Sequence, residues 1–254
     1  MKRMMIAAAL LSAFALAGCV TTSDQPQKRK PDADAGRDAY IQLGLGYLQE
    51  GETESAKAPL SEALKLDPRS ASAHLALAMV FQQEGETASA DKHYRDALSS
   101  EPGNPRILNN YGVFLLSEER YDEALGYFEK ASKDTLYGER SRVFENIGLT
   151  YQRMGRLEEA KASFERALRL NSRQPLALLQ MAKIEFAEQN FVPAWGYYRS
   201  FTEFSGQSAE SLWLGIQLAR RFEDHNRAAS YALQLRRLYP ASPEAKEMKA
   251  SDQS

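Results

Sequence analysis

The sequence predicts an all-α fold, an α-solenoid built from repeated pairs of helices. Ala and Leu together supply 66 of the 254 residues, whereas Val and Ile supply 11. Because Ala and Leu are strong helix formers and β-branched residues favour strands, this balance favours helices. An alanine followed four residues later by a large apolar residue recurs at intervals of 34, 34, 36, 34 and 34 residues, and only its last copy lacks the large apolar residue. A fixed period of this length is typical of stacked helical repeats.

Charge and cysteine content exclude several classes of protein. The chain has 32 Lys and Arg against 34 Asp and Glu, a formal net charge of −2, so it is not a broadly basic nucleic-acid binder. A hydrophobic content of 43% excludes a globally disordered chain. The single cysteine excludes a disulfide framework and a cysteine-rich metal site.

Residues 1–18 are typical of a bacterial lipoprotein signal peptide. Lys2 and Arg3 precede an apolar run over residues 4–17, which is shorter than the about 20 residues of a membrane-spanning helix. The run ends Leu-Ala-Gly and then Cys19, which resembles the lipobox, in which the cysteine becomes the first mature residue and is lipidated. An ordinary signal peptide with an incidental cysteine is the alternative.

The lipobox resemblance implies an anchored protein that does not span the membrane. Acylation of Cys19 with more than one chain gives stable anchoring. Lipoproteins retained in the inner membrane often carry Asp after the cysteine, and Val20 stands here. We therefore expect the outer membrane, with the protein on its periplasmic face.

Residues 19–36 are expected to be the lipidated cysteine and a flexible tether. Residues 20–36 are mostly Thr, Ser, Gln, Pro, Lys, Asp and Gly, which offer almost nothing to bury. The basic run 28–30 is balanced by Asp24, Asp32 and Asp34, so a solvated linker is favoured over a lipid-binding segment.

Residues 37–242 divide into six repeats: 37–70, 71–104, 105–140, 141–174, 175–208 and 209–242. Their recurring alanines are Ala56, Ala90, Ala124, Ala160, Ala194 and Ala228. Together with the large residues at fixed distances, this pattern resembles the tetratricopeptide repeat. The resemblance implies helix pairs stacked into a right-handed superhelix. Residues 243–254 are expected to form a C-terminal cap and tail, because Ser242-Pro243-Glu244 is typical of a helix start.

The sequence contains no recognisable catalytic constellation. The three histidines, His74, His93 and His225, belong to no H-E-x-x-H pair, and there is no G-x-x-x-x-G-K-[ST] phosphate loop. His74 falls at a packing position of the second repeat, where a half-buried histidine is expected. The sequence therefore predicts a protein that is not an enzyme and has no catalytic residue, metal site or cofactor.

The N-terminal half of the inner face is predicted to be an apolar partner-binding groove. Five positions of each first helix usually line the concave face of a tetratricopeptide array, and in the first three repeats seven of them are apolar: Ile41, Leu45, Leu48, Leu75, Met79, Val113 and Leu116. A contiguous apolar patch that stacking does not need usually marks a partner site, here for an apolar strand or helix. The alternative is that these side chains pack on one another. In the sixth repeat the same positions are basic around Trp213.

A lipobox, a short tether and six repeats together resemble the type IV pilus biogenesis lipoproteins of the PilW/PilF family, often called pilotins. The segment Asn109-Asn110-Tyr111-Gly112, followed by 124–128, resembles the third repeat of that family. The resemblance implies a non-enzymatic factor that binds secretin subunits of the type IV pilus and promotes their outer-membrane localisation and multimerisation. No nucleic acid or small-molecule substrate is expected, and a monomer is expected.

Two other functions remain open from the sequence. The chain could be a tetratricopeptide lipoprotein that scaffolds β-barrel assembly or peptidoglycan synthesis. A wall-active enzyme is the third possibility, against which the missing catalytic constellation argues.

Overall fold

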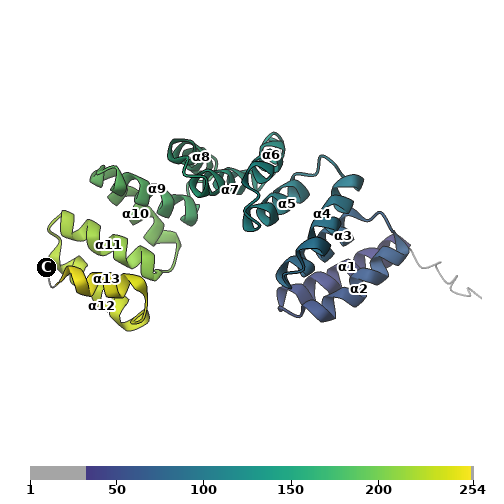
Figure 1. Cartoon of the computed structure of the whole chain (residues 1–254), viewed down its shortest axis with the longest axis horizontal. Coiled ribbons are helices and arrows are strands. Elements are labelled where there is room, and N and C mark those ends of the chain that lie inside the picture. Colours follow the sequence, from purple (N-terminus) through teal and green to yellow (C-terminus); the bar gives the residue numbers. More distant parts are fainter. Residues whose placement is uncertain (1–32, 253–254) are drawn as a thin grey trace, which may run out of the picture.

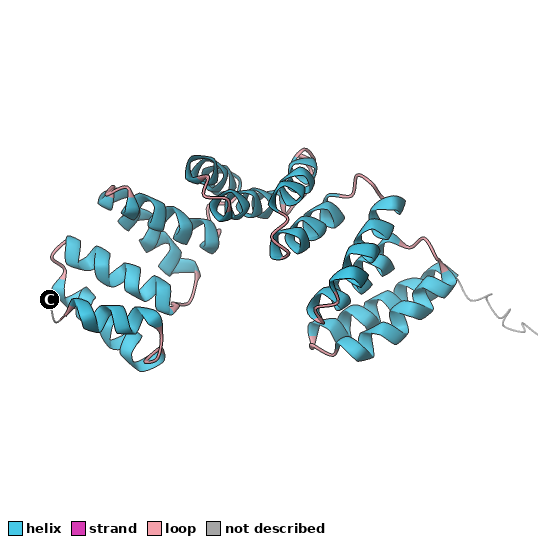
Figure 2. Ribbon diagram, in the orientation of Figure 1, coloured by secondary structure: helices cyan, strands magenta, loops and turns pink. Residues whose placement is uncertain are grey.

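The computed structural model describes residues 33–252, which form thirteen α-helices and no strand (Figures 1 and 2). The helices are α1 (Ala33–Gln49), α2 (Thr53–Leu66), α3 (Ala71–Gln83), α4 (Thr87–Ser100), α5 (Pro105–Ser117), α6 (Tyr121–Ser132), α7 (Arg140–Arg153), α8 (Leu157–Leu170), α9 (Pro175–Ala187), α10 (Phe191–Phe204), α11 (Ala209–Arg221), α12 (His225–Leu238) and α13 (Pro243–Ser251).

The first twelve helices pack as six consecutive pairs, and α13 covers the last pair. Each of these twelve helices packs most extensively against its partner, and successive pairs pack against one another along the chain. The pairs follow an arc, with α1–α4 at one end and α11–α13 at the other (Figure 1). The predicted all-α solenoid is therefore confirmed.

Small residues bring the two helices of a pair into close contact. The recurring alanines are fully buried in the first five pairs, from Ala56 to Ala194, and nearly so at Ala228. On the facing helix, a Cβ atom added to Gly112 would lie 2.6 Å from Cε1 of Phe128. No real Cβ contact is that short, so the spacing between α5 and α6 requires glycine here.

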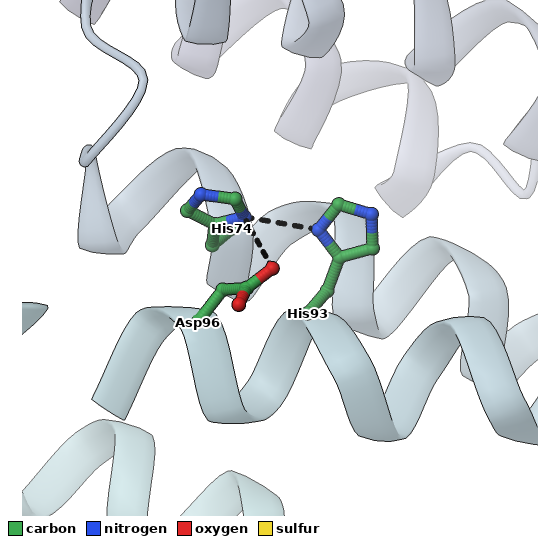
Figure 3. A group of neighbouring side chains, drawn as sticks. All are labelled: His74, His93 and Asp96. Atoms are coloured by element: carbon green, nitrogen blue, oxygen red, sulfur yellow. Dashed lines mark hydrogen bonds and ion pairs between the residues drawn. The ribbon is translucent and has the colours of Figure 1, made fainter. Parts of the chain in front are cut away.

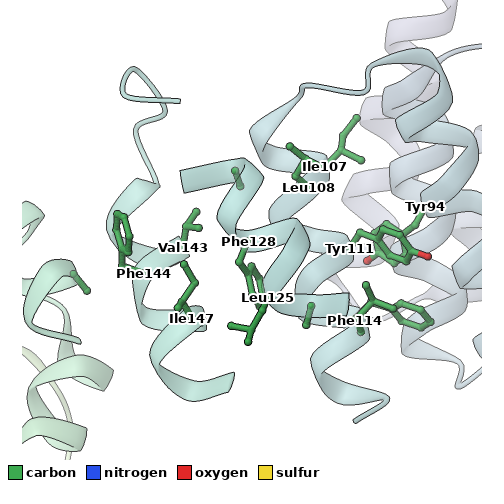
Figure 4. Close-up of a cluster of buried hydrophobic side chains, with 14 of the residues drawn as sticks. Tyr94, Ile107, Leu108, Tyr111, Phe114, Leu125, Phe128, Val143, Phe144 and Ile147 are labelled. Carbon is green, nitrogen blue, oxygen red and sulfur yellow. The ribbon is translucent and has the colours of Figure 1, made fainter. Parts of the chain in front are cut away.

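The interior is continuous through the middle of the array. Its largest cluster of buried side chains extends from α3 to α9 and includes the aromatic rings of Tyr94, Tyr111 and Phe128 (Figure 4). The second to fifth pairs share this cluster, because a single helix pair cannot bury its own apolar face. The array therefore gains stability from the stacking of neighbouring pairs.

The turns within the pairs are nearly identical. Each turn has three residues, and its middle residue has a positive φ. Glycine occupies this position in the first, second and fourth pairs, as at Gly155, whereas Glu119, Gln189 and Glu223 occupy it in the others. The two extra residues of the 36-residue interval lie in the longer connection between α6 and α7, residues 133–139.

The first helix begins earlier than the sequence analysis placed it. Residues 33–36, expected to belong to the tether, are the first turn of α1. Arg37 stabilises this turn, because its guanidinium lies 2.9 Å from Asp34 and 3.3 Å from Asp67 at the end of α2. The predicted signal peptide, Cys19 and the rest of the tether lie outside the described residues. None of the helices described is both long and apolar enough to cross a membrane.

Helix α13 closes the C-terminal end of the array. Ser242 caps it by accepting a hydrogen bond from the backbone NH of Ala245 at 3.1 Å. Ala245 and Met248 are buried against α11 and α12. The end of the solenoid is thus covered by a helix with an otherwise polar surface.

Candidate partner-binding groove

A hollow of about 550 Å³ lies on the inner side of the first three pairs. Helices α1, α3 and α5 supply most of its lining, and α4 contributes one ring. The lining residues are Leu45, Leu48, Gln49, Met79, Gln82, Gln83, Tyr94, Asn110 and Val113. We call this hollow the N-terminal groove.

Four of the seven residues predicted for the groove line it. Leu45, Leu48, Met79 and Val113 are half-buried and contribute its apolar surface. Leu116 is half-buried too, but it packs against the main core and does not line the hollow.

The remaining two predicted residues are buried within the array. Ile41 is 5% exposed and packs with Ala63 and Ala73, and Leu75 is 3% exposed within the main cluster. Neither residue lines the hollow, because Ile41 is enclosed by α2 and α3 and Leu75 is enclosed by the main cluster. These two residues are therefore part of the core and offer no surface to a partner.

Uncharged amide side chains complete the groove. Gln49, Gln82, Gln83 and Asn110 surround its apolar surface, and none of the nine lining residues is charged. Amides offer both donors and acceptors, which suits the backbone of an extended segment or polar side chains of a helix. A charged side chain entering here would lose its hydration without a partner, so the groove suits an uncharged, partly apolar segment.

Tyr94 links this amide set to the core. Its ring is 1% exposed, and its hydroxyl donates a 2.7 Å hydrogen bond to Oε1 of Gln82. Burial raises the pKa of the Tyr94 phenol well above its usual range, so the hydroxyl remains a donor at any physiological pH. Sequence reasoning missed Tyr94, which is at a packing position of its repeat, and Asn110, which is outside the five positions expected to line the inner face. An aromatic residue that carries a hydroxyl at a packing position was the available signal.

Beyond the groove, the inner face is held by amide pairs between successive helix pairs. Nδ2 of Asn146 donates to Oδ1 of Asn109 at 2.9 Å, and Nε2 of Gln152 donates to Oε1 of Gln180 at 3.0 Å. These contacts join α5 to α7 and α7 to α9. The middle of the inner face is thus polar and internally bonded.

Glu145 on α7 has a structural role at the next junction. Its carboxylate accepts a 2.9 Å hydrogen bond from the backbone NH of Ala177, in the first turn of α9. The side chain is 8% exposed, and burial raises the pKa of Glu145, although the Ala177 bond opposes this shift. This residue fixes the entry of α9 and does not face a partner.

The basic and aromatic surface predicted in the sixth repeat is occupied by the chain itself. The guanidinium of Arg220 lies 5.9 Å from the centre of the Trp213 ring and bonds to Ser251 and Asp252 at the end of α13. Arg221 stacks over Phe191, 4.4 Å from its ring centre. These arginines are engaged in holding α10, α11 and α13 together.

Comparison with known proteins identifies relatives that share this repeat architecture. Family models described as tetratricopeptide repeat match residues 104–173, 41–90 and 146–209. The type IV pilus assembly protein PilF of Pseudomonas aeruginosa is 55% identical over 241 residues, which are 94% of this chain and 96% of that protein.

Solved structures lead to the same group. The structure of Pseudomonas aeruginosa PilF has 56% identity and a TM-score of 0.84, covering 86% of this chain and 99% of that one. PilW, described as a widely conserved type IV pilus biogenesis factor, has 28% identity and a TM-score of 0.73, covering 84% and 97%. The chain therefore belongs to the PilF/PilW family of type IV pilus biogenesis factors, which are tetratricopeptide-repeat proteins.

Proposed function

We propose that this protein is an outer-membrane lipoprotein that binds secretin subunits and promotes their localisation and multimerisation during type IV pilus assembly. The observation that carries the proposal is the 55% identity to PilF across 94% of the chain. It acts by binding, without a chemical step of its own.

The N-terminal groove is the surface to which we assign the secretin segment. Leu45, Met79 and Val113 offer apolar contacts, and the amides around them offer hydrogen bonds to a backbone. A few buried contacts at the centre of an interface usually dominate its affinity. The incoming segment should therefore present one or two apolar side chains between uncharged residues.

The anchor that we propose at Cys19 would hold this groove near the membrane. Helix α1 starts at Ala33 and reaches Leu45 after roughly 20 Å of helix. A linker over residues 20–32 reaches roughly 20 Å when it is unstructured. Lipid anchor, linker and groove would thus keep a bound secretin subunit within a few tens of ångströms of the membrane into which it inserts.

Deletion of the gene in the native host tests the proposal. Outer membranes are fractionated without boiling and blotted for heat-resistant secretin multimers, and the deletion strain is complemented with wild type, Cys19→Ser or Met79→Glu. We expect multimers to disappear on deletion and to return with wild type only. Normal multimers in the deletion strain would refute the secretin role, and β-barrel assembly and wall synthesis would then be examined.

The two variants separate the parts of the proposal. Cys19→Ser should leave the secretin subunit bound but away from the outer membrane. Met79→Glu should leave the protein anchored but unable to retain the subunit in co-precipitation. If Met79→Glu restores multimers fully, the groove is not the secretin site.

A further inference from the structure

Three ionisable side chains meet between the two helices of the second pair. His74 lies on α3, and His93 and Asp96 lie three residues apart on α4, so the last two share one face of their helix. Figure 3 shows His93 and Asp96 extending from α4 toward His74. No motif in the sequence indicates this group, because 19 residues separate the two histidines.

The three candidate ligand atoms lie close enough together to hold one metal ion. Nδ1 of His74 lies 3.0 Å from Nδ1 of His93 and 3.9 Å from Oδ2 of Asp96, and all three ligand atoms lie within 4.8 Å of one another. Ligand atoms on a tetrahedral zinc ion, each about 2.0–2.1 Å from the metal, are about 3.3 Å apart. The two histidine nitrogens are already near that spacing, and the Asp96 carboxylate would have to rotate toward them.

The surroundings orient both rings for such a role. Nε2 of His74 lies 3.1 Å from the backbone oxygen of Pro68, to which it can donate its proton. A histidine that donates from one nitrogen to a carbonyl presents the lone pair of the other nitrogen, as in most metal-bound histidines. The ring of His93 stacks on Phe81, with centroids 5.3 Å apart and planes inclined by 17°. Both rings therefore present Nδ1 to the same point.

An ion can reach this point from solvent. The three residues are half-buried, with the His74 side chain 12% and the Asp96 side chain 39% exposed. The ammonium group of Lys92 lies 3.7 Å from Asp96, and a metal ion would compete with it for the carboxylate. Three protein ligands leave one coordination position for water or for a group from another molecule.

We propose that His74, His93 and Asp96 form a binding site for a divalent transition metal ion, with Zn²⁺ the best match to two imidazoles and one carboxylate. The ion joins α3 to α4. It stabilises the second helix pair, from which Met79, Gln82 and Tyr94 reach the N-terminal groove.

Zinc titration of the full chain, purified in detergent without a histidine tag, tests this site. We expect calorimetry to show one Zn²⁺ per chain. At a free Zn²⁺ concentration 100 times the Kd, the Tm should rise by roughly 5–10 °C. The variants His74→Gln and Asp96→Asn should bind at least about tenfold more weakly, because even residues behind the ligands contribute that much to metal sites.

His225→Gln is the matched control, because His225 lies in the first turn of α12, far along the chain from the cluster. It should bind Zn²⁺ as wild type does. Asp96→Asn keeps the shape of a partly exposed side chain, so its circular dichroism and Tm in EDTA should match wild type. The site is disproved if wild type shows no heat and no Tm shift, or if Asp96→Asn binds with unchanged affinity.

Discussion

The hydroxyl of Tyr94 donates a 2.7 Å hydrogen bond to Oε1 of Gln82, and this contact joins the buried core of the second pair to the N-terminal groove. The ring of Tyr94 packs in the core and reaches the groove, and Gln82 lines the groove beside it. Since the oxygen of Gln82 is engaged, its nitrogen carries the donors that remain for a bound segment. The core therefore determines which hydrogen bonds the groove can offer.

Tyr94→Phe should weaken partner binding and cost a little stability. The ring still fills its place, but Gln82 loses the bond that orients its amide. We expect a loss of about 0.5–1.5 kcal/mol in the free energy of unfolding, measured by urea denaturation. Affinity for the secretin should fall severalfold in a pull-down or calorimetric titration.

Tyr198→Phe provides the control for that change. Its hydroxyl also donates to a glutamine, Gln207 at 3.2 Å, but far from the groove. This variant should lose stability with unchanged partner binding. Equal affinities of wild type and Tyr94→Phe would show that the orientation of Gln82 is irrelevant to binding.

Met79→Glu should abolish partner binding and leave the fold intact. Met79 is half-buried and lines the groove, so a carboxylate there would have to be desolvated beneath an apolar segment. Helical circular dichroism should be unchanged, while co-precipitation of the secretin is lost. Leu136→Glu is the control, because Leu136 is 93% exposed in the α6–α7 connection and should tolerate the charge.

The repeat architecture followed from the sequence because it depends on local contacts. The residues that set the spacing of two helices, such as Gly112 and Phe128, belong to the same pair, so the pattern within one repeat predicts that pair. The groove was predicted only in part, because burial there depends on contacts between successive helix pairs. Whether Ile41 or Leu75 is covered depends on how closely the next helix pair approaches, which no single repeat determines.

Two further features that the sequence did not predict also depend on contacts between helices. The cluster of His74, His93 and Asp96 requires the register of α3 against α4, which the spacing of residues does not reveal. The first turn of α1 is tied to the end of α2, because Arg37 pairs with both Asp34 and Asp67, the latter 30 positions away. The composition of 33–36, with its glycine and acidic residue, resembled a linker because that contact is invisible in the sequence.

Gly112→Ala should destabilise the array. The added methyl group would lie 2.6 Å from the Phe128 ring, which is itself fully buried and cannot move freely. We expect a loss of about 1–3 kcal/mol in urea denaturation. Gly126→Ala, in the neighbouring helix α6, meets no atom within 4 Å and should instead stabilise by about 0.5–1 kcal/mol. Similar effects of the two substitutions would contradict the close approach of α5 and α6.

The stability of the α7–α9 junction should depend on pH through Glu145. Its pKa in the folded protein is raised by burial, so the folded state favours the protonated form. Burying the charged carboxylate lowers the free energy of unfolding. This loss reaches its full size above the pKa of the folded state and disappears below the pKa of the unfolded state, about 4.3. Glu145→Gln should therefore be more stable than wild type at pH 7.5, and the difference should vanish as the pH falls toward 4.

Glu84→Gln gives a comparison of opposite sign. The hydrogen bond from Lys57, 2.8 Å away, lowers the pKa of Glu84, so its contribution to stability is present at neutral pH and is lost on acidification. This variant should be less stable than wild type at pH 7.5 and should converge with it at low pH. If the two variants change stability in the same direction at pH 7.5, the role assigned to Glu145 is wrong.

Gln189→Gly should stabilise the fifth pair. Gln189 has a φ of 62° in the turn between α9 and α10, a conformation that costs a residue with a Cβ about 1–2 kcal/mol relative to glycine. Glycine also gains freedom in the unfolded chain, which offsets part of this benefit, so we expect a net gain of about 0.5–1 kcal/mol in urea denaturation. The reverse change, Gly155→Ala, places a Cβ at φ 74° in the equivalent turn between α7 and α8 and should destabilise by a similar amount. A destabilising Gln189→Gly would mean that its side chain, and not the backbone of the turn, is what this position requires.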